Sequence, residues 1–168
     1  KNISLFKNLT EYTKNKITSQ DFIFLISLII IDETDNSEYF LYKFNISNED
    51  KKRIRFLQNV FSKPLDRKTF SEKNLWKMLY YNNKNYLNDL INFQIYRSKK
   101  IDKKLIKLKE FFSNQLPPKF NVKAKFLMEK FNLKEGKELG QKIKEIEIAW
   151  INNSFKITDQ QIEKIING

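Results

Sequence analysis

Apolar residues recur along most of this chain at the three- and four-residue spacing that places them on one face of a helix. Ile54, Leu57 and Phe61 follow each other at this spacing. Similar spacing recurs in the segments 69–79, 86–95 and 101–112. Strict alternation of apolar and polar residues, which is the pattern of a half-buried strand, is nowhere sustained. The pattern therefore predicts an all-α protein.

One segment is apolar on every side. Residues 22–31 read FIFLISLIII and lie between Asp21 and Asp32. A membrane span needs roughly 20 apolar residues, so this shorter run predicts a helix buried in the core. Polar and charged residues fill the positions before it, without the pattern of a secretory signal. We expect a soluble, cytoplasmic protein with no membrane partner.

Two consecutive prolines divide the chain. Pro117 and Pro118 end the helix before them, because proline lacks an amide donor and disfavours helical backbone in the preceding residue. We therefore expect a bundle-like helical body over residues 1–115 and a small helical tail over residues 116–168. Within the tail, helices are expected over residues 123–131, 140–151 and 158–166.

Composition and charge narrow the function. The absence of cysteine and histidine excludes disulfides, thiol nucleophiles and cysteine-ligated zinc, and removes the usual general base. The net charge is +12, and residues 97–144 hold 15 Lys and Arg against five Asp and Glu. Such a basic segment attracts polyanions, with nucleic acid as the first candidate. A second explanation stays open, since an AT-rich genome raises the lysine content of its proteins everywhere.

Two of the three glycines lie four residues apart in the stretch FNLKEGKELGQKIKEIEIAW, residues 131–150. Gly136 and Gly140 are surrounded by lysines and precede a strongly periodic helical segment. Glycine lets backbone amides approach a ligand closely, and a helix N-terminus presents free amides with a partial positive charge. This turn is a candidate phosphate seat. In the structural alternative, Gly136 ends the preceding segment and Gly140 permits a close helix crossing.

The whole tail follows a longer pattern: Pro118-Lys119-Phe120, then Phe126-Leu127-Met128, then Asn132-Leu133-Lys134-Glu135-Gly136-Lys137-Glu138-Leu139-Gly140, and finally Trp150. It resembles the C-terminal tail of bacterial class II tRNA nucleotidyltransferases, the CCA-adding enzymes and their poly(A) polymerase relatives. Residues 21–31 and 41–57 are similar to body segments of alphaproteobacterial members. The family's first turn glycine falls here on Asn132, and asparagine tolerates left-handed backbone. Its proline falls on Glu135, and two residues of its short helix fall on Ala124 and Phe126.

The resemblance implies a catalytic head outside this chain. In that family, an Asp-x-Asp pair after a Gly-Gly turn holds the metal ions for nucleotidyl transfer, and neither motif occurs in this sequence. We therefore expect a non-catalytic C-terminal portion of such an enzyme, comprising the end of the neck, the body and the tail. The chain itself would hold no catalytic residue, metal or cofactor. Mg²⁺ and CTP or ATP would belong to the head, which is the expected partner in cis, or in trans if the protein is split.

The segment Glu49-Asp50-Lys51-Lys52-Arg53 spells the Glu-Asp-x-x-Arg pattern with which that family selects CTP or ATP. The surrounding sequence differs, because Ile54-Arg55-Phe56-Leu57 follows instead of the family's Leu-Arg-x-x-Arg-Phe. Ser47 and Asp50 are spaced like a capping box. We interpret Glu49 and Asp50 as helix N-terminal residues, and residues 51–53 as solvated.

We expect the body and tail to hold the acceptor stem and elbow of tRNA, or another structured RNA, by phosphate contacts that read shape and not base sequence. The candidate RNA-binding residues are Arg97, Lys99, Lys100, Lys103, Lys104, Lys107, Lys123, Lys125, Lys134, Gly136, Lys137, Gly140 and Lys142. The alternative function is a helical scaffold that docks a separate catalytic subunit through aromatic side chains. The aromatic candidates are Trp76, Tyr80, Tyr81, Tyr86 and Tyr96.

Overall fold

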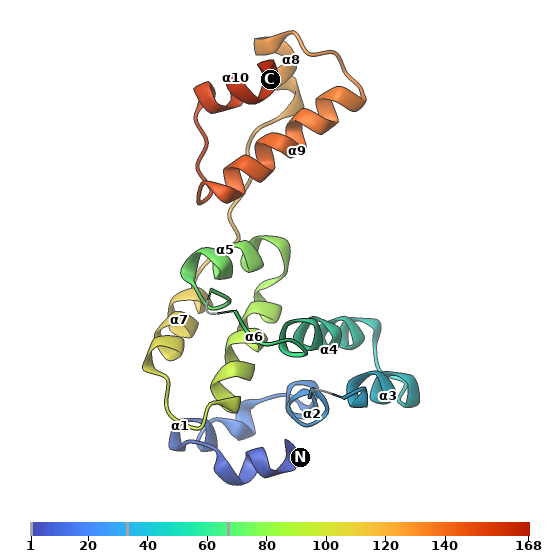
Figure 1. Ribbon diagram of the computed structural model, residues 1–168, viewed down its shortest axis with the longest axis vertical. Helices are drawn as coiled ribbons and strands as arrows, with labels where there is room; N and C mark the ends of the chain where they lie inside the picture. The colour runs from blue at the N-terminus through green and yellow to red at the C-terminus, as the bar shows by residue number, and fades with distance from the viewer. Residues whose placement is uncertain (1, 33, 67) are drawn as a thin grey trace. The chain divides into compact units, whose positions relative to one another are not determined.

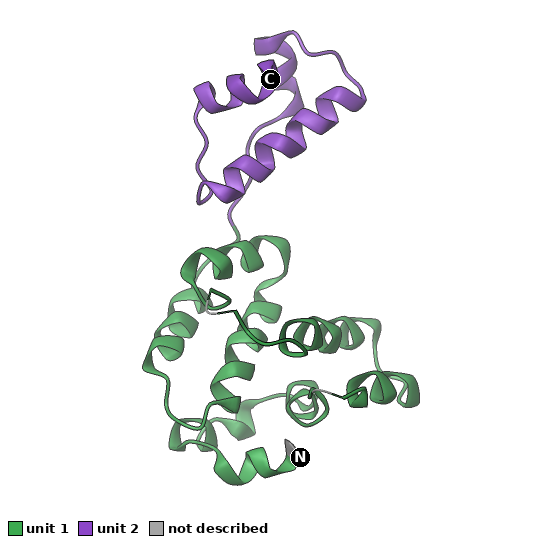
Figure 2. Ribbon diagram, viewed as in Figure 1, with its two compact units in different colours: residues 1–117 green, residues 118–168 purple. Residues whose placement is uncertain are grey.

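The computed structural model describes residues 2–32, 34–66 and 68–168 (Figure 1). These residues form helices and loops without any β-strand, which confirms the predicted all-α class. Contacts between helices divide the chain into two compact units, Lys1–Pro117 and Pro118–Gly168 (Figure 2). The boundary expected from the sequence lies two residues before this division.

The first unit begins with short helices and continues with longer ones. Its helices are η1 (Asn2–Asn8), α1 (Glu11–Lys14), η2 (Ile17–Ser19), α2 (Phe22–Ile30), α3 (Asn36–Lys43), α4 (Asn48–Phe61), α5 (Glu72–Tyr81), α6 (Lys84–Arg97) and α7 (Lys103–Ser113). The helices of the second unit are α8 (Ala124–Phe131), α9 (Lys137–Asn152) and α10 (Asp159–Asn167). Every helix in the described ranges is too short or too polar to cross a bilayer.

The core of the first unit lies where α2, α4 and α6 pack together. Phe24 and Leu28 of α2, with Ile31 just after it, are almost completely buried, and so is Ile54 of α4. Phe24 also packs edge-on against Phe93 of α6, with 6.5 Å between the ring centroids. The predicted core helix over residues 22–31 is therefore confirmed, although it ends at Ile30.

Ion pairs through Arg53 join the same three helices. The Arg53 guanidinium donates to Asp21 from Nη1 at 2.9 Å and from Nη2 at 2.6 Å, and it donates to Asp89 from Nη2 at 2.8 Å and from Nε. Burial raises the pKa of the Asp89 carboxyl, and hydrogen bonds from Arg53 oppose this rise without cancelling it. Partial burial also acts to raise the pKa of Asp21, but hydrogen bonds from Arg53 and the Phe24 amide outweigh it and lower that pKa. The prediction that Arg53 is solvated is wrong.

The second unit has its own small core, formed by Leu127, Leu139, Ile146 and Ile162. Three further features set the ends of its helices. Asn132 ends α8 in left-handed backbone with φ 54°, and Gly136 precedes α9 with φ 150°, a conformation that favours glycine. Thr158 and Gln161 form a reciprocal capping box at the start of α10. Because α9 begins at Lys137, three residues earlier than expected, Gly140 lies inside the helix.

Candidate nucleic-acid interface

The basic residues of the late body occupy different surfaces of the first unit. Arg97 ends α6, and its guanidinium carbon lies 5.9 Å from the ring centroid of Phe61 and 5.5 Å from that of Phe93. Arg97 and Lys99 line a hollow of about 220 Å³ together with residues of η1. Lys100 is exposed in the segment between α6 and α7. The structure thus separates Arg97 and Lys99 from the lysines of α7, which line another hollow.

The start of α7 positions its lysines. Asp102 accepts hydrogen bonds from the amides of Lys104 and Leu105, both at 3.0 Å, and so satisfies two of the amides that a helix leaves free at its N-terminus. Leu105 is buried in the core, whereas Lys103, Lys104 and Lys107 are exposed. The helix therefore holds these three cations on its solvent side at fixed intervals.

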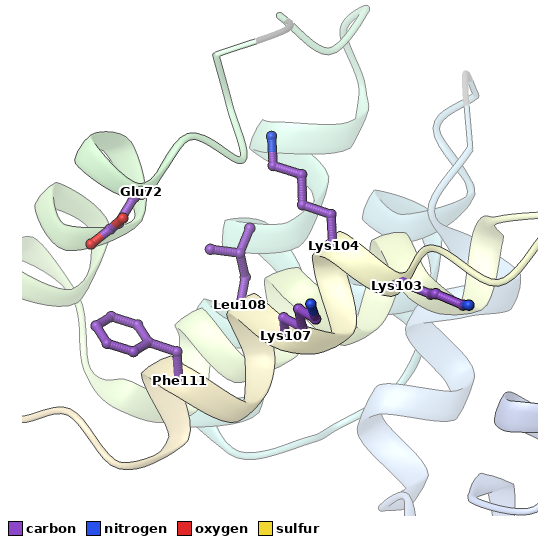
Figure 3. Close-up of a pocket in the computed structure, with 6 residues that line it drawn as sticks. All are labelled: Glu72, Lys103, Lys104, Lys107, Leu108 and Phe111. Carbon is purple, nitrogen blue, oxygen red and sulfur yellow. The ribbon is translucent and has the colours of Figure 1, made fainter.

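These lysines border an open depression between α5 and α7, with a volume of about 460 Å³ (Figure 3). Its lining residues are Glu72, Lys103, Lys104, Lys107, Leu108 and Phe111. In Figure 3, Glu72 and Phe111 lie at one end of the depression and the lysines lie toward the other. The α5–α7 depression, as we call it below, combines a cationic end with an apolar floor.

The candidate cations of the body have no acidic partner within the described ranges. None of the ion pairs found there involves Arg97, Lys99, Lys100, Lys103, Lys104 or Lys107. Lys109 of α7 differs from them, because it is half-buried, and burial together with repulsion by Lys16 lowers its pKa. Exposed cations that form no ion pair keep their charge available for an anionic ligand.

In the tail, the turn before α9 brings several candidates together. Lys134, Gly136 and Lys137 are exposed and consecutive or nearly so, whereas Lys123 is exposed before α8. Gly136 offers the first turn of α9 no side-chain cap, and this turn also holds the acidic Glu138. The Gly140 amide is already used, since it donates to the Gly136 carbonyl at 3.2 Å. A Cβ on Gly140 would meet nothing within 4 Å, so no close helix crossing requires this glycine.

Two of the tail lysines make contacts within the protein. The half-buried Lys142 donates from Nζ to the carbonyl of Ile165 at 2.6 Å, near the end of α10, and pairs with Glu145 at 3.6 Å. A cation at a helix C-terminus is stabilising because the last carbonyls carry a partial negative charge. The exposed Lys125 lies 3.7 Å from Glu129, one turn further along α8. Lys142 thus joins α9 to α10, and its ammonium is less free than those of the turn.

The first two residues of the Glu-Asp-x-x-Arg pattern, Glu49 and Asp50, form hydrogen bonds within the protein. Ser47 caps α4 by accepting from the Asp50 amide at 3.1 Å, and its hydroxyl donates to the Asp50 carboxylate at 2.7 Å. Glu49 accepts a hydrogen bond from the Tyr86 hydroxyl at 2.8 Å. The pKa of Tyr86 is raised to about 12, mainly by burial and next by this hydrogen bond. Glu49 and Asp50 lie in the first turn of α4, as predicted.

A divalent metal does not fit the acidic residues that lie near one another in the first unit. Asp21 and Asp89 are both bound by Arg53, so a cation already occupies the space between them. Within the described ranges, three or more acidic side chains nowhere gather in a way that could hold a metal ion.

The candidates from the sequence lacked three residues of the α5–α7 depression: Glu72, Leu108 and Phe111. Phe111 follows Lys104 and Lys107 at helical spacing, which places it on the same face as they are. This spacing was a usable signal, but Phe111 also stands next to the fully buried Phe112. The sequence alone does not say which of the two neighbouring phenylalanines faces solvent. Glu72 lies on another helix, and nothing local connects it with α7.

No protein-family model, no curated protein and no solved structure matches this chain at a significant level.

Proposed function

We propose that the chain is a non-catalytic RNA-binding module that holds a structured RNA, such as tRNA, by contacts to its phosphates. The observation that carries this proposal is the set of exposed body cations that lack acidic partners, above all the three lysines that border the α5–α7 depression. Lysine binds phosphate as a mobile point charge, and a contact to phosphate carries no base specificity. Recognition would therefore follow the shape of an A-form helix.

The tail supplies the second part of the proposed surface. Lys134 lies just before α9 and Lys137 is its first residue, and the amides and dipole of a helix N-terminus favour an anion such as a phosphate. Lys123 adds a cation before α8. Each unit thus has its own candidate phosphate contacts, and the proposal does not depend on how the two units are placed.

We further propose that the module is the body and tail of a class II tRNA nucleotidyltransferase or poly(A) polymerase relative. Support comes from the tail pattern around Gly136 and Gly140, and from Asn132, whose φ of 54° suits a position where the family has glycine. The catalytic head, with Mg²⁺ and CTP or ATP, would be a separate part. The chain incubated alone with tRNA, CTP, ATP and Mg²⁺ should add no nucleotide, and any incorporation that depends on the chain would overturn this assignment.

A salt series tests whether the lysines bind RNA through electrostatic contacts to phosphate. The Gln variant of Lys103, Lys104 and Lys107 should bind a duplex RNA hairpin more weakly than the wild type at about 50 mM salt, because each lost phosphate contact reduces the slope of log affinity against log salt by about 0.7–0.9. Three contacts correspond to a slope that is smaller by about 2–3. Filter binding or fluorescence anisotropy measures both quantities.

The matched control replaces the exposed Lys7, Lys14 and Lys43 by Gln. This control removes the same charge from the region before residue 48, where acidic residues balance the basic ones, and it should leave the slope nearly unchanged. Equal effects of the two triple variants would mean that net charge alone causes the binding. A flat salt response of the wild type would reject the proposal.

A scaffold remains the second candidate. Of the aromatic residues that the sequence suggested, Tyr96 is buried at 3% exposure and Tyr81 is 64% exposed. Further exposed aromatic residues lie on α3 or directly after it: Tyr39, Tyr42 and Phe44 are 62%, 87% and 52% exposed. Exposed aromatic residues at one element favour a protein partner. Light scattering should detect a higher assembly, or a complex with a catalytic head, that the Tyr42→Ser variant loses. A monomer that binds no head would count against the scaffold.

A further inference from the structure

We propose that the α5–α7 depression binds one unpaired nucleotide of an RNA strand, with its base against Phe111 and its phosphates on the lysines of α7. This inference rests on the proposed RNA binding and adds the kind of RNA element that this surface takes. Duplex RNA keeps its bases stacked inside the helix and offers phosphates alone, so an aromatic floor serves an unpaired base and not a duplex.

The apolar part of the depression contains an exposed aromatic ring. Phe111 is 43% exposed, yet its ring is fixed by two neighbours that lie nearly perpendicular to it. Its centroid is 6.1 Å from that of Trp76 and 5.1 Å from that of Phe112. Trp76 and Phe112 are themselves in contact at 5.2 Å. An exposed ring that is already immobilised loses little conformational entropy when a base stacks on it.

Charged side chains are followed by apolar side chains along one face of α7. Lys104, Lys107, Leu108 and Phe111 are three, four and seven residues apart, which places them on one face of the helix. The cationic end and the ring are separated by about 10 Å along the helix axis, from a rise of 1.5 Å per residue. A nucleotide has the same asymmetry, because an anionic phosphate stands at one end and an apolar base face at the other.

Glu72 borders the depression from the N-terminus of α5, near the Phe111 end (Figure 3). Its carboxylate accepts a hydrogen bond from Nε1 of Trp76 at 3.4 Å, which keeps it next to the aromatic cluster. A carboxylate repels phosphate and accepts hydrogen bonds from exocyclic amino groups, such as N4 of cytosine. Glu72 therefore directs the phosphates toward the lysines and favours an amino-bearing base over uracil.

Anisotropy titrations with two labelled RNAs test the inference on the full chain. One RNA is a single-stranded oligoadenylate of about ten nucleotides, within the range of known single-strand sites, and the other is a duplex hairpin of similar length. Phe111→Leu keeps an apolar side chain on Trp76 and removes the aromatic face. It should weaken binding of the single strand about tenfold, as expected for one lost base stack, and should leave the hairpin affinity unchanged.

Three further variants make the test specific. Phe22→Leu removes an aromatic side chain that is 67% exposed on α2 and should change neither affinity. Phe111→Trp restores a stacking face and should keep the single-strand affinity of the wild type, which a merely structural role of Phe111 would not explain. Glu72→Gln should reduce the preference for oligoadenylate over oligouridylate, with circular dichroism confirming that each variant is folded.

The outcomes separate this inference from the proposed function. If Phe111→Leu leaves single-strand binding unchanged, or weakens single-strand and hairpin binding equally, the nucleotide site is refuted while the phosphate grip stands. If the wild type binds neither RNA in a salt-dependent manner, the proposed function fails and the nucleotide site fails with it. Selective loss of single-strand binding, restored by Phe111→Trp, supports both.

Discussion

The surroundings of each basic side chain, and not its type, decide its role in this protein. Arg53 is bound on two sides by Asp21 and Asp89, and Lys142 donates to a backbone carbonyl of α10. Lys103 and Lys104, by contrast, are exposed on α7. The first two stabilise the fold, whereas exposed cations are available to a ligand.

Gly140 lies inside α9, where glycine costs about 1 kcal/mol relative to alanine. No neighbouring atom requires the absence of its Cβ. Gly140→Ala should therefore raise the unfolding free energy of the tail by about 1 kcal/mol. If RNA approaches the backbone at this turn, the same change should weaken RNA binding several-fold.

Urea unfolding and RNA titration of one protein sample measure the two effects. Gln141→Ala, a change at the next exposed position of α9, controls for a general change in helix stability. Higher stability with an unchanged RNA affinity would remove Gly140 from the interface.

Single helices have different roles on their two sides. α7 buries Leu105 and Phe112 and exposes its three candidate lysines. α4 turns Ile54 and Leu57 into the core, while Arg53 joins it to α2 and α6. The inner side of each helix fixes its position, and this position determines what the outer side presents to solvent.

The Arg53 network gives a prediction for these helices. Arg53→Met leaves the Asp89 carboxylate buried without its cation, which costs about 3–5 kcal/mol near neutral pH. Burial already raises the pKa of Asp89, and loss of Arg53 raises it further. The folded state then favours the protonated carboxyl, so stability is lost as pH rises through the folded pKa and is regained toward acid.

Urea unfolding near pH 4.5 and pH 7.5 measures this difference, which should be smaller at the lower pH. Arg55→Met is the matched control two positions away. Arg55 forms an exposed pair with Glu38 at 3.8 Å, and such pairs contribute about 0–1 kcal/mol. Equal losses for both variants at both pH values would contradict a structural role of the network.

On the scale of the whole molecule, the residues that the structure describes form two hydrophobic cores. The core of Pro118–Gly168 consists of Leu127, Leu139, Ile146 and Ile162 with partly buried neighbours. A unit of about 50 residues buries a smaller fraction of its unfolded surface than a larger domain does, and it is marginally stable. The body has the larger core, built mainly from residues of α2 to α7 together with Leu9.

Ile146→Ala tests the independence of the two units. The cavity should cost about 2–5 kcal/mol, enough to unfold the tail while the body stays folded. The chain has two tryptophans, Trp76 in the body and Trp150 in the tail, so Trp76→Phe and Trp150→Phe backgrounds report each unit separately by fluorescence. Loss of the Trp76 signal together with that of Trp150 would show that the units unfold as one.

The helical spacing of apolar residues predicted the segments of α4 to α10, and a continuous apolar run predicted α2, because both patterns depend only on the neighbours of each residue along the chain. They did not predict the short helices η1, α1 and η2, and two later elements also departed from them. α3 was missed, since Tyr39 and Tyr42 stay exposed beside the buried Phe40 and Leu41 and obscure the period. α9 was predicted to begin at Gly140, but the φ of 150° at Gly136 sets its start at Lys137.

The sequence by itself determined the helical class, most of the helices, the division near Pro117 and the concentration of basic residues in the second half of the chain. The tertiary structure alone decided which charges are paired and which are free. Arg53 meets Asp21 and Asp89, which lie 32 and 36 residues away, and Glu72 comes beside α7 from another helix. The reason is physical: helix formation follows local spacing, whereas the partner of a side chain depends on how distant segments pack.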